Sequence, residues 1–355
     1  MANQVAYGFM NLQGLFSEKL TDSNVATVSE AIQRSVEEHN RQMNALLGLF
    51  ASRTTNHTIR YQQLGQNRLQ PLDENGRALP VRPQGFYDVA FPIRDAGSAW
   101  GQTFKARAKM TVADANRLTA FMLAGDRVWV RDQILAALFE TTAYNYIDPQ
   151  YGTLSVQPLA NGDAVAYDRN GGAPAVDTHQ LFHNNDIVDL ADPFPAIREE
   201  LMEHPENSGE VLALMPSSRR AEIEALTGFH KVADPNIAQS IASDRLVGSL
   251  GVSVPGELIG YHDAGVWIAE WKSLPADYGI AVTTGGEPAL AMREEPERSL
   301  QGFYQVPEDR NDHPFYERQW ARHAGFGAWN RVGALVIEID DSSYGIPSGY
   351  NAPIP

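Results

Sequence analysis

Two histidines, His179 and His183, stand four residues apart in the segment DTHQLFHNND. On a helix, this spacing could turn both imidazoles toward one metal ion. The segment lacks the glutamate of the HExxH pattern, and its other residues are typical of a loop. We therefore expect a polar surface at these histidines and predict that the chain binds no metal.

Paired acidic residues are the next candidates for chemistry, because two carboxylates can divide the acid and base steps of a reaction. Side chains that are adjacent in sequence point apart, so such pairs are more typical of solvated faces. We expect no catalytic pair among them. The pairs are Glu199 with Glu200, Glu294 with Glu295, and Asp340 with Asp341.

The glycine-containing segments do not match known catalytic loops. GVSVPG at 251–256 places a serine between glycines but differs from the GxSxG pattern. The glycines between 248 and 256 fit neither a P-loop nor a GxGxxG fingerprint. The chain has no cysteine, which excludes disulfides, zinc–thiolate sites and cysteine nucleophiles. We predict no catalytic residue, no cofactor and no enzymatic activity.

Arginine and aromatic residues gather in FYERQWARHAGFGAWNR, at 315–331, where they could stack on nucleic acid bases. The formal net charge of −16 argues against tight binding of a phosphate backbone. Contact between protein subunits and ordinary packing of Trp320 and Trp329 in the core both remain open. Arginine suits interfaces better than lysine, and the chain has twenty-three arginines against five lysines. Candidate inter-subunit contacts, from this segment and the polar stretch 65–85, are Arg68, Arg77, Arg82, Arg318, Trp320, Arg322, Trp329 and Arg331.

The composition is that of a globular protein. Of 355 residues, 43% are hydrophobic and 20% are charged, which allows one large domain or two to three smaller ones. No apolar run approaches the roughly 18 residues of a membrane span, and the N-terminus lacks the basic start and apolar core of a signal peptide. We predict no membrane association.

The first third of the chain is expected to form an arm, a helix and a long β-hairpin. Residues 1–24 mix aromatic residues and leucines with glycines, as an extended arm would. A helix follows, capped by Thr27 or Ser29 and ending near 48–52, because apolar residues recur at helical spacing. Alternation over 87–93 and over 104–110 predicts half-buried strands. The prolines and the Asn-Gly pair between the strands predict an irregular tip.

A longer helix is expected over 111–145, capped by Thr111 and broken or kinked at Gly125. The turn residues over 148–178 predict a small hairpin or surface insertion.

Helices and strands alternate from about residue 185, which predicts a compact α+β domain over roughly 190–320. Within it, Ser217 is expected to cap a helix, and another helix is expected over 234–250. A final strand at 332–340 is expected to return and pack with the long helix.

The order of these parts resembles the major capsid protein of tailed bacteriophages, the HK-ninety-seven-like capsid fold family. GYHDAGVWIAEWKSLPADYG at 260–279 is similar to the axial-domain strand pair that ends in Leu-Pro. YERQWARHAGFGAWNRVGALVIEID at 316–340 is similar to the approach to the last peripheral strand. The resemblance implies an α+β fold with an N-arm, a long β-hairpin extended loop, a peripheral domain with a spine helix, and an axial domain. The implied boundaries are 1–54 for the arm and its helix, 55–110 for the extended loop, 111–190 for the peripheral domain, 191–319 for the axial domain, and 320–355 for the returning strand and C-terminal tail.

The resemblance also implies a structural function. The chain would self-assemble as pentamers and hexamers into the icosahedral head shell of a tailed phage, in the virion, after synthesis in the bacterial host cytoplasm. The shell would enclose double-stranded DNA without specific binding. A scaffold, a portal and a decoration protein are further partners found in the family. The segment 62–82 has no lysine, so we expect no covalent cross-link there. The early start of the long helix predicts a separate scaffold protein or none.

Three other interpretations stay open. Within the same fold, the chain could form an encapsulin-like compartment shell or a gene-transfer-type particle. From a different class, it could be a soluble hydrolase that uses carboxylates. It could also be another structural protein of a virion or a tail.

Overall fold

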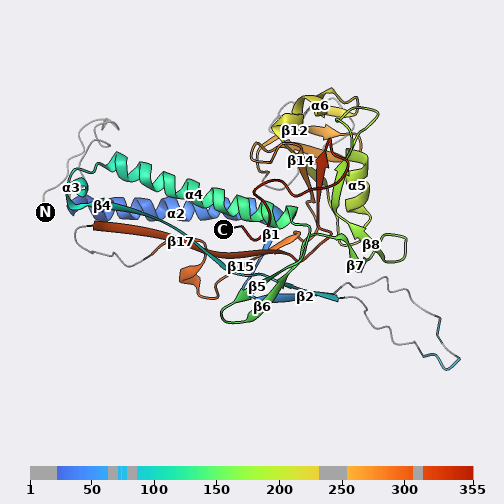
Figure 1. Cartoon of the computed structure of the whole chain (residues 1–355), viewed down its shortest axis with the longest axis horizontal. Helices are drawn as coiled ribbons and strands as arrows, with labels where there is room; N and C mark the ends of the chain where they lie inside the picture. The colour runs from blue at the N-terminus through green and yellow to red at the C-terminus, as the bar shows by residue number, and fades with distance from the viewer. Residues whose placement is uncertain are drawn as a thin grey trace. The chain divides into compact units, whose positions relative to one another are not determined.

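A computed structural model describes residues 22–62, 71–72, 74–77, 86–231, 254–306 and 315–354 (Figure 1). The expected arm up to residue 21, most of the hairpin tip and the expected helix at 234–250 lie outside these residues. The chain divides into two compact units. One comprises Met1–Asn44, Arg94–Arg131 and Glu294–Ala324, and the other Ala45–Ile93, Asp132–Arg293 and Gly325–Pro355. No helix within the described ranges is long and apolar enough to cross a membrane.

The helix α2, the first among the described residues, runs from Asp22 to Phe50 and ends where the sequence predicts. It begins before the expected caps at Thr27 and Ser29. Between residues 32 and 47 its buried residues recur every three or four positions, which places them on one face of the helix. These residues are Ile32, Val36, His39, Met43 and Leu47.

The second long helix, α4, runs from Val112 to Phe139 and lies beside α2 (Figure 1). Thr111 caps it as predicted. The Thr111 hydroxyl accepts a hydrogen bond from the Asp114 N–H at 3.2 Å, and the Asp114 carboxylate accepts one from the Thr111 N–H at 3.1 Å. The helix continues without a break through Gly125. The space around Gly125 is open, so no close contact requires a glycine there.

The first unit also contains an antiparallel set of three strands. β17, Phe315–Ala328, pairs with β4, Arg94–Thr103, through ten residue pairs and with β16, Phe303–Gln305. The predicted strand at 104–110 is wrong, because a short helix, α3, occupies Phe104–Arg107. The alternation that suggested a strand consists largely of alanine and lysine, which have little preference for strands. The 3₁₀-helix η2, Arg298–Leu300, completes these elements.

The base of the predicted long hairpin is present in the second unit. β2, Thr58–Gln62, and β3, Phe86–Ala90, form an antiparallel pair from Thr58 opposite Ala90 to Gln62 opposite Phe86. The predicted alternation holds in β3, where Tyr87 and Val89 are buried. A short parallel pair joins β1, Ala51–Thr54, to β15, Leu290–Glu294.

The turn-rich stretch after α4 forms two small hairpins, in agreement with the prediction. The first joins β5, Tyr144–Asp148, to β6, Gly152–Val156. The second joins β7, Asn161–Tyr167, to β8, Ala175–Thr178.

A seven-stranded mixed sheet forms the largest part of the second unit. The helix α5, Phe194–Met202, the 3₁₀-helix η1, Ser217–Arg219, and the helix α6, Arg220–Ala225, accompany it (Figure 1). Phe194, Ile197 and Ile223 pack against the sheet in one apolar cluster. The strand order is β11 (Phe229–Lys231), β12 (Glu257–His262), β13 (Val266–Glu270), β10 (Val211–Met215), β14 (Tyr278–Thr283), β18 (Ala334–Ile339) and β9 (Gln180–His183).

The last strand, β18, lies between β14 and β9 in the sheet. One expectation for this region differs from the structure. The Ser217 hydroxyl donates a hydrogen bond to Glu270 Oε1 at 2.7 Å and does not cap the helix that follows. A partner on a distant strand therefore replaces the local cap.

Candidate functional site

The eight candidate contact residues lie in different environments. Trp320, Arg322 and Arg331 are buried, with Arg322 only 2% exposed and Arg331 only 1% exposed. Trp329 and Arg318 are half-buried. Arg77 is exposed, whereas Arg68 and Arg82 lie outside the described residues. Trp320, Arg322 and Arg331 therefore pack inside their own chain. Arg318 and Arg77 keep exposed side-chain surface that a neighbouring subunit could contact.

Arg322 forms the centre of a buried charge cluster in the first unit. Its Nε and Nη2 donate to the two carboxylate oxygens of Asp126 at 2.5 and 2.8 Å, in a bidentate pair. His39 Nε2 lies 2.7 Å from Asp126 Oδ2, and Arg322 Nη2 lies 3.3 Å from Asn40 Oδ1. The cluster thereby links α2, α4 and β17. Burial alone would raise the pKa of Asp126, but hydrogen bonds from His39 and Arg322 outweigh it, so the pKa is lowered.

This lowered pKa predicts a contribution to acid sensitivity. A carboxylate whose folded pKa is depressed stabilises the fold above its unfolded pKa, about 3.9, and that stability is lost as the pH falls through the folded pKa. We expect the free energy of unfolding to fall more steeply between about pH 5 and pH 2 in the wild type than in the double variant Arg322→Met/Asp126→Leu. Urea denaturation across this pH range measures the difference. Equal pH dependence of the two proteins would contradict it.

Arg331 forms the centre of a second buried cluster, in the second unit. Its Nε donates to Pro158 O at 2.7 Å, and its Nη1 donates to Asp163 Oδ2 at 2.7 Å. Its Nη2 lies 3.2 Å from both Leu159 O and Asn161 Oδ1. The guanidinium also lies 5.6 Å from the centre of the Tyr87 ring. This arginine therefore attaches residues 158–163, which include the start of β7, to the connection between β17 and β18.

The two histidines of DTHQLFHNND do not face a common site, because each has a different hydrogen-bond partner. His183 Nε2 lies 3.0 Å from Ala191 O. His179 is fully buried, and its Nε2 lies 3.1 Å from His204 Nε2. The expectation of a polar surface is therefore wrong for His179. The segment joins β8 to β9 instead of forming a helix, and its partner His204 follows α5, which residue spacing does not reveal.

The expectation of solvated acidic pairs also fails in part. Glu294 is buried and accepts a hydrogen bond from the Gly302 N–H at 3.2 Å. Asp340 and Asp341 are exposed, as expected.

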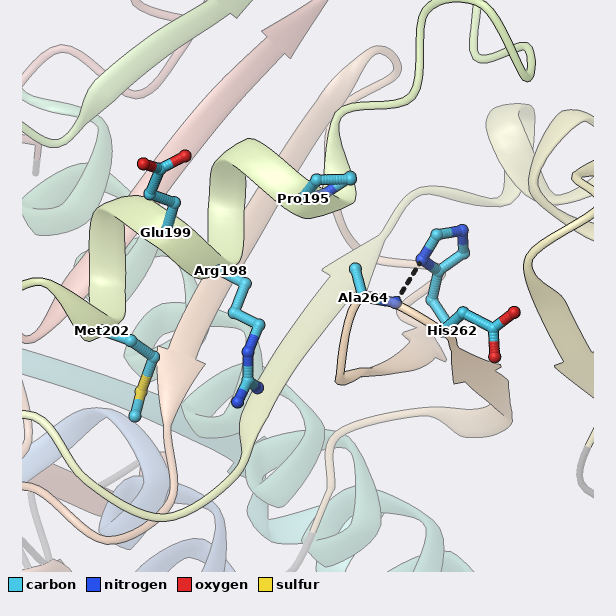
Figure 2. Close-up of a pocket in the computed structure, with 7 residues that line it drawn as sticks. Pro195, Arg198, Glu199, Met202, His262 and Ala264 are labelled. Carbon is cyan, nitrogen blue, oxygen red and sulfur yellow. Dashed lines mark hydrogen bonds between the residues drawn. The ribbon is translucent and has the colours of Figure 1, made fainter.

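A surface hollow of about 600 Å³ lies between α5 and the turn that joins β12 to β13. Arg198 and Glu199 leave α5 in different directions there (Figure 2). Arg198 Nη1 donates to Gly265 O at 2.7 Å, and His262 Nδ1 accepts from the Ala264 N–H at 3.2 Å. His262 Nε2 lies 3.2 Å from Asp192 Oδ2. These polar groups brace the local fold, and their arrangement gives no support for the carboxylate-dependent hydrolase.

Large apolar side chains are exposed on several separate elements. Phe121 is 70% exposed and stands seven residues from the exposed Val128, so both lie on one face of α4. Ile147, on β5, is 78% exposed, and Leu190, in the connection after β9, is fully exposed. Such residues suit several distinct contacts with neighbouring molecules better than one deep binding site.

Comparisons with known protein structures identify the fold of this chain. No family model matches the sequence, and no curated protein matches it. A chain of Mycobacterium phage Patience matches in structure with a TM-score of 0.67 and 18% identity, covering 99% of this chain and 98% of that one. The mature capsid of bacteriophage PhiM1 gives a TM-score of 0.48 at 10% identity, covering 97% and 92%. The capsid of a native GTA particle gives 0.47 at 11% identity, covering 84% and 90%. The chain shares its fold with the first of these over nearly the full length of both.

Proposed function

We propose that this chain, which has the α+β HK-ninety-seven-like capsid fold, is a major capsid protein that assembles with copies of itself into the icosahedral head shell of a tailed phage. The observation that carries the proposal is the fold match to a phage chain over 99% of this chain and 98% of the other. On this proposal the protein is structural and has no enzymatic activity.

The exposed surface supports a subunit that makes several moderate contacts. Apolar side chains are exposed on α4, on β5 and after β9. A shell repeats each such contact by symmetry, so individually weak interfaces add up over many neighbours. We infer that the subunits group as pentamers and hexamers. Arg77 and Arg318 are the candidate residues that retain surface for contact with a neighbour, and Trp329 is half-buried.

The net charge supports a container for DNA. At −16, the chain repels a phosphate backbone, so we infer that the shell encloses double-stranded DNA without specific binding. A scaffold, a portal and a decoration protein remain proposed partners. Assembly in the bacterial cytoplasm and location in the virion follow from the same proposal.

Assembly of the expressed chain tests this function. We expect closed shells, or rings of five or six subunits, when the chain is expressed alone or with a scaffold protein. Size-exclusion chromatography followed by negative-stain electron microscopy detects both. A stable monomer that hydrolyses ester or glycoside substrates would contradict the proposal.

Shortening the long hairpin is expected to abolish assembly and leave the fold of the subunit intact. Replacing residues 63–85 with Asn-Gly closes β2 and β3, which end at the Gln62–Phe86 pair, with a two-residue turn. We expect the free energy of unfolding to rise by no more than about 2 kcal/mol, because a shorter connection between the paired strands costs less loop-closure entropy. We expect shells to be lost, because the hairpin is proposed to reach a neighbouring subunit.

Denaturation curves and negative-stain images of the shortened variant give the two readouts. Normal shells from this variant would show that the hairpin makes no essential contact.

A further inference from the structure

Three potential metal ligands meet in the interior of the second unit. Asp177 lies on β8, His179 lies between β8 and β9, and His204 follows α5. Both histidine side chains are fully buried, and Asp177 is 5% exposed. One ligand atom from each residue lies within 4.8 Å of the other two. The topology thus brings together groups from two segments that are 25 residues apart.

Backbone carbonyls determine which nitrogen of each histidine carries a proton. His179 Nδ1 lies 2.8 Å from Ala334 O, and His204 Nδ1 lies 2.9 Å from Asp168 O. A carbonyl only accepts hydrogen bonds, so each Nδ1 donates, and each neutral imidazole keeps a lone pair on Nε2. Histidines that bind metals are commonly held in this way, by a carbonyl on the nitrogen that does not bind.

The lone pairs of these ligands point toward one another. The two Nε2 atoms are 3.1 Å apart, and Asp177 Oδ2 lies 3.1 Å from His204 Nε2. Asp177 Oδ2 has no hydrogen bond of good geometry among the described residues. Facing lone pairs repel unless a cation lies between them. Zn²⁺ with tetrahedral bonds of 2.0 to 2.1 Å holds its ligand atoms about 3.3 Å apart, close to these separations.

Acidic side chains gather around these ligands and can balance the charge of a divalent cation. Asp177, Glu200 and Glu203 bring three carboxylates, whose oxygens lie within 4.8 Å of one another. Arg169 Nη2 lies 3.1 Å from Asp177 Oδ2 and 3.2 Å from Glu203 Oε1. When all three carboxylates are ionised, this arginine leaves a charge of −2, which Zn²⁺ balances.

We propose that Asp177, His179 and His204 bind Zn²⁺ as a structural site, with Glu203 or a water molecule as the fourth ligand. Glu203 Oε1 lies 3.8 Å from His204 Nε2, within reach of a small side-chain adjustment. Two imidazoles with carboxylate oxygens form a ligand set that zinc accepts. The ion connects the β8–β9 segment to the end of α5. This assignment departs from the expectation of no metal, which considered His183 as the partner of His179.

A proton is the competing occupant of this position. Burial would lower the pKa of His204, but the nearby Asp177 carboxylate and the hydrogen bond to the Asp168 carbonyl raise it, so the imidazolium could form. Zinc binding and simple protonation predict different responses to added metal.

Zinc titration of the purified full-length protein, after chelator treatment and dialysis, tests the site. We expect one Zn²⁺ per chain by isothermal titration calorimetry and by elemental analysis. We also expect an unfolding temperature that rises with Zn²⁺ concentration, because the ion binds the folded state. Zinc-edge absorption spectra of the loaded protein should show imidazole ligands.

Matched variants locate the ion. Asp177→Asn and His179→Gln should each bind Zn²⁺ at least about 10-fold more weakly. His183→Gln, on the neighbouring strand and bonded to Ala191 O, should bind it as the wild type does. Absence of stoichiometric zinc binding in the wild type would leave the proton as the occupant and overturn the proposal. Full binding by both ligand variants would overturn it as well.

Discussion

Replacing Arg322 with alanine is expected to lower the free energy of unfolding by about 3–5 kcal/mol. The change removes the bidentate partner of Asp126, whose carboxylate is 1% exposed. His39 alone compensates the charge of the remaining buried carboxylate poorly, and the cavity left by the buried arginine side chain adds to the loss. Urea denaturation, monitored by tryptophan fluorescence, measures the effect. Trp320 and Trp100 report on this region, since their rings stack with centroids 6.2 Å apart.

Two variants separate the ion pair from general damage to the strand. Arg322→Met with Asp126→Leu replaces both charges with apolar side chains and should recover most of the lost stability. Arg318→Ala changes a half-buried arginine on the same strand and should cost less than about 1 kcal/mol. A loss of less than 1 kcal/mol in Arg322→Ala would contradict the role of the cluster.

Replacing Arg331 with alanine is expected to cost about 3 kcal/mol or more. It removes the Nε donor of the Pro158 carbonyl and the Nη2 donor of the Leu159 carbonyl. It also removes the cation beside the Tyr87 and Tyr167 rings. Native-state hydrogen exchange should show faster exchange at Ala160, whose N–H donates to Arg331 O at 2.9 Å, and through β7.

Arg331→Lys is the matched variant for this cluster. Lysine keeps the charge but lacks the planar guanidinium, so it can donate hydrogen bonds to only some of the four partners of Arg331. These partners are Pro158, Leu159, Asn161 and Asp163. We expect it to recover less than half of the stability that alanine loses. Full recovery with lysine would show that charge alone, rather than the fork, holds this segment.

Local patterns in the sequence predict much of the secondary structure. The end of α2, the Thr111 cap of α4 and the two hairpins after α4 depend on residues within a few positions of one another. Capping side chains, helical spacing and turn residues act over such short distances, so the sequence displays them directly.

Features that depend on distant partners could not be predicted in this way. Arg322 meets Asp126 across 196 positions, and His179 meets His204 across 25. No periodicity encodes those pairings, so the arginines of 315–331 could be interpreted either as a surface or as core. The strand β17 was missed for the same reason, because its ten-residue pairing with the distant β4 leaves no local pattern in a segment with two glycines near its end.

Sedimentation velocity of the expressed and purified chain tests the central claim, self-assembly into a shell, most directly. The proposal predicts a fast boundary of closed particles made of many copies of the 39.1 kDa chain, seen as hollow spheres by electron microscopy of the same fraction. A single slow boundary at the mass of one chain, with and without a scaffold protein and at all concentrations, would contradict it.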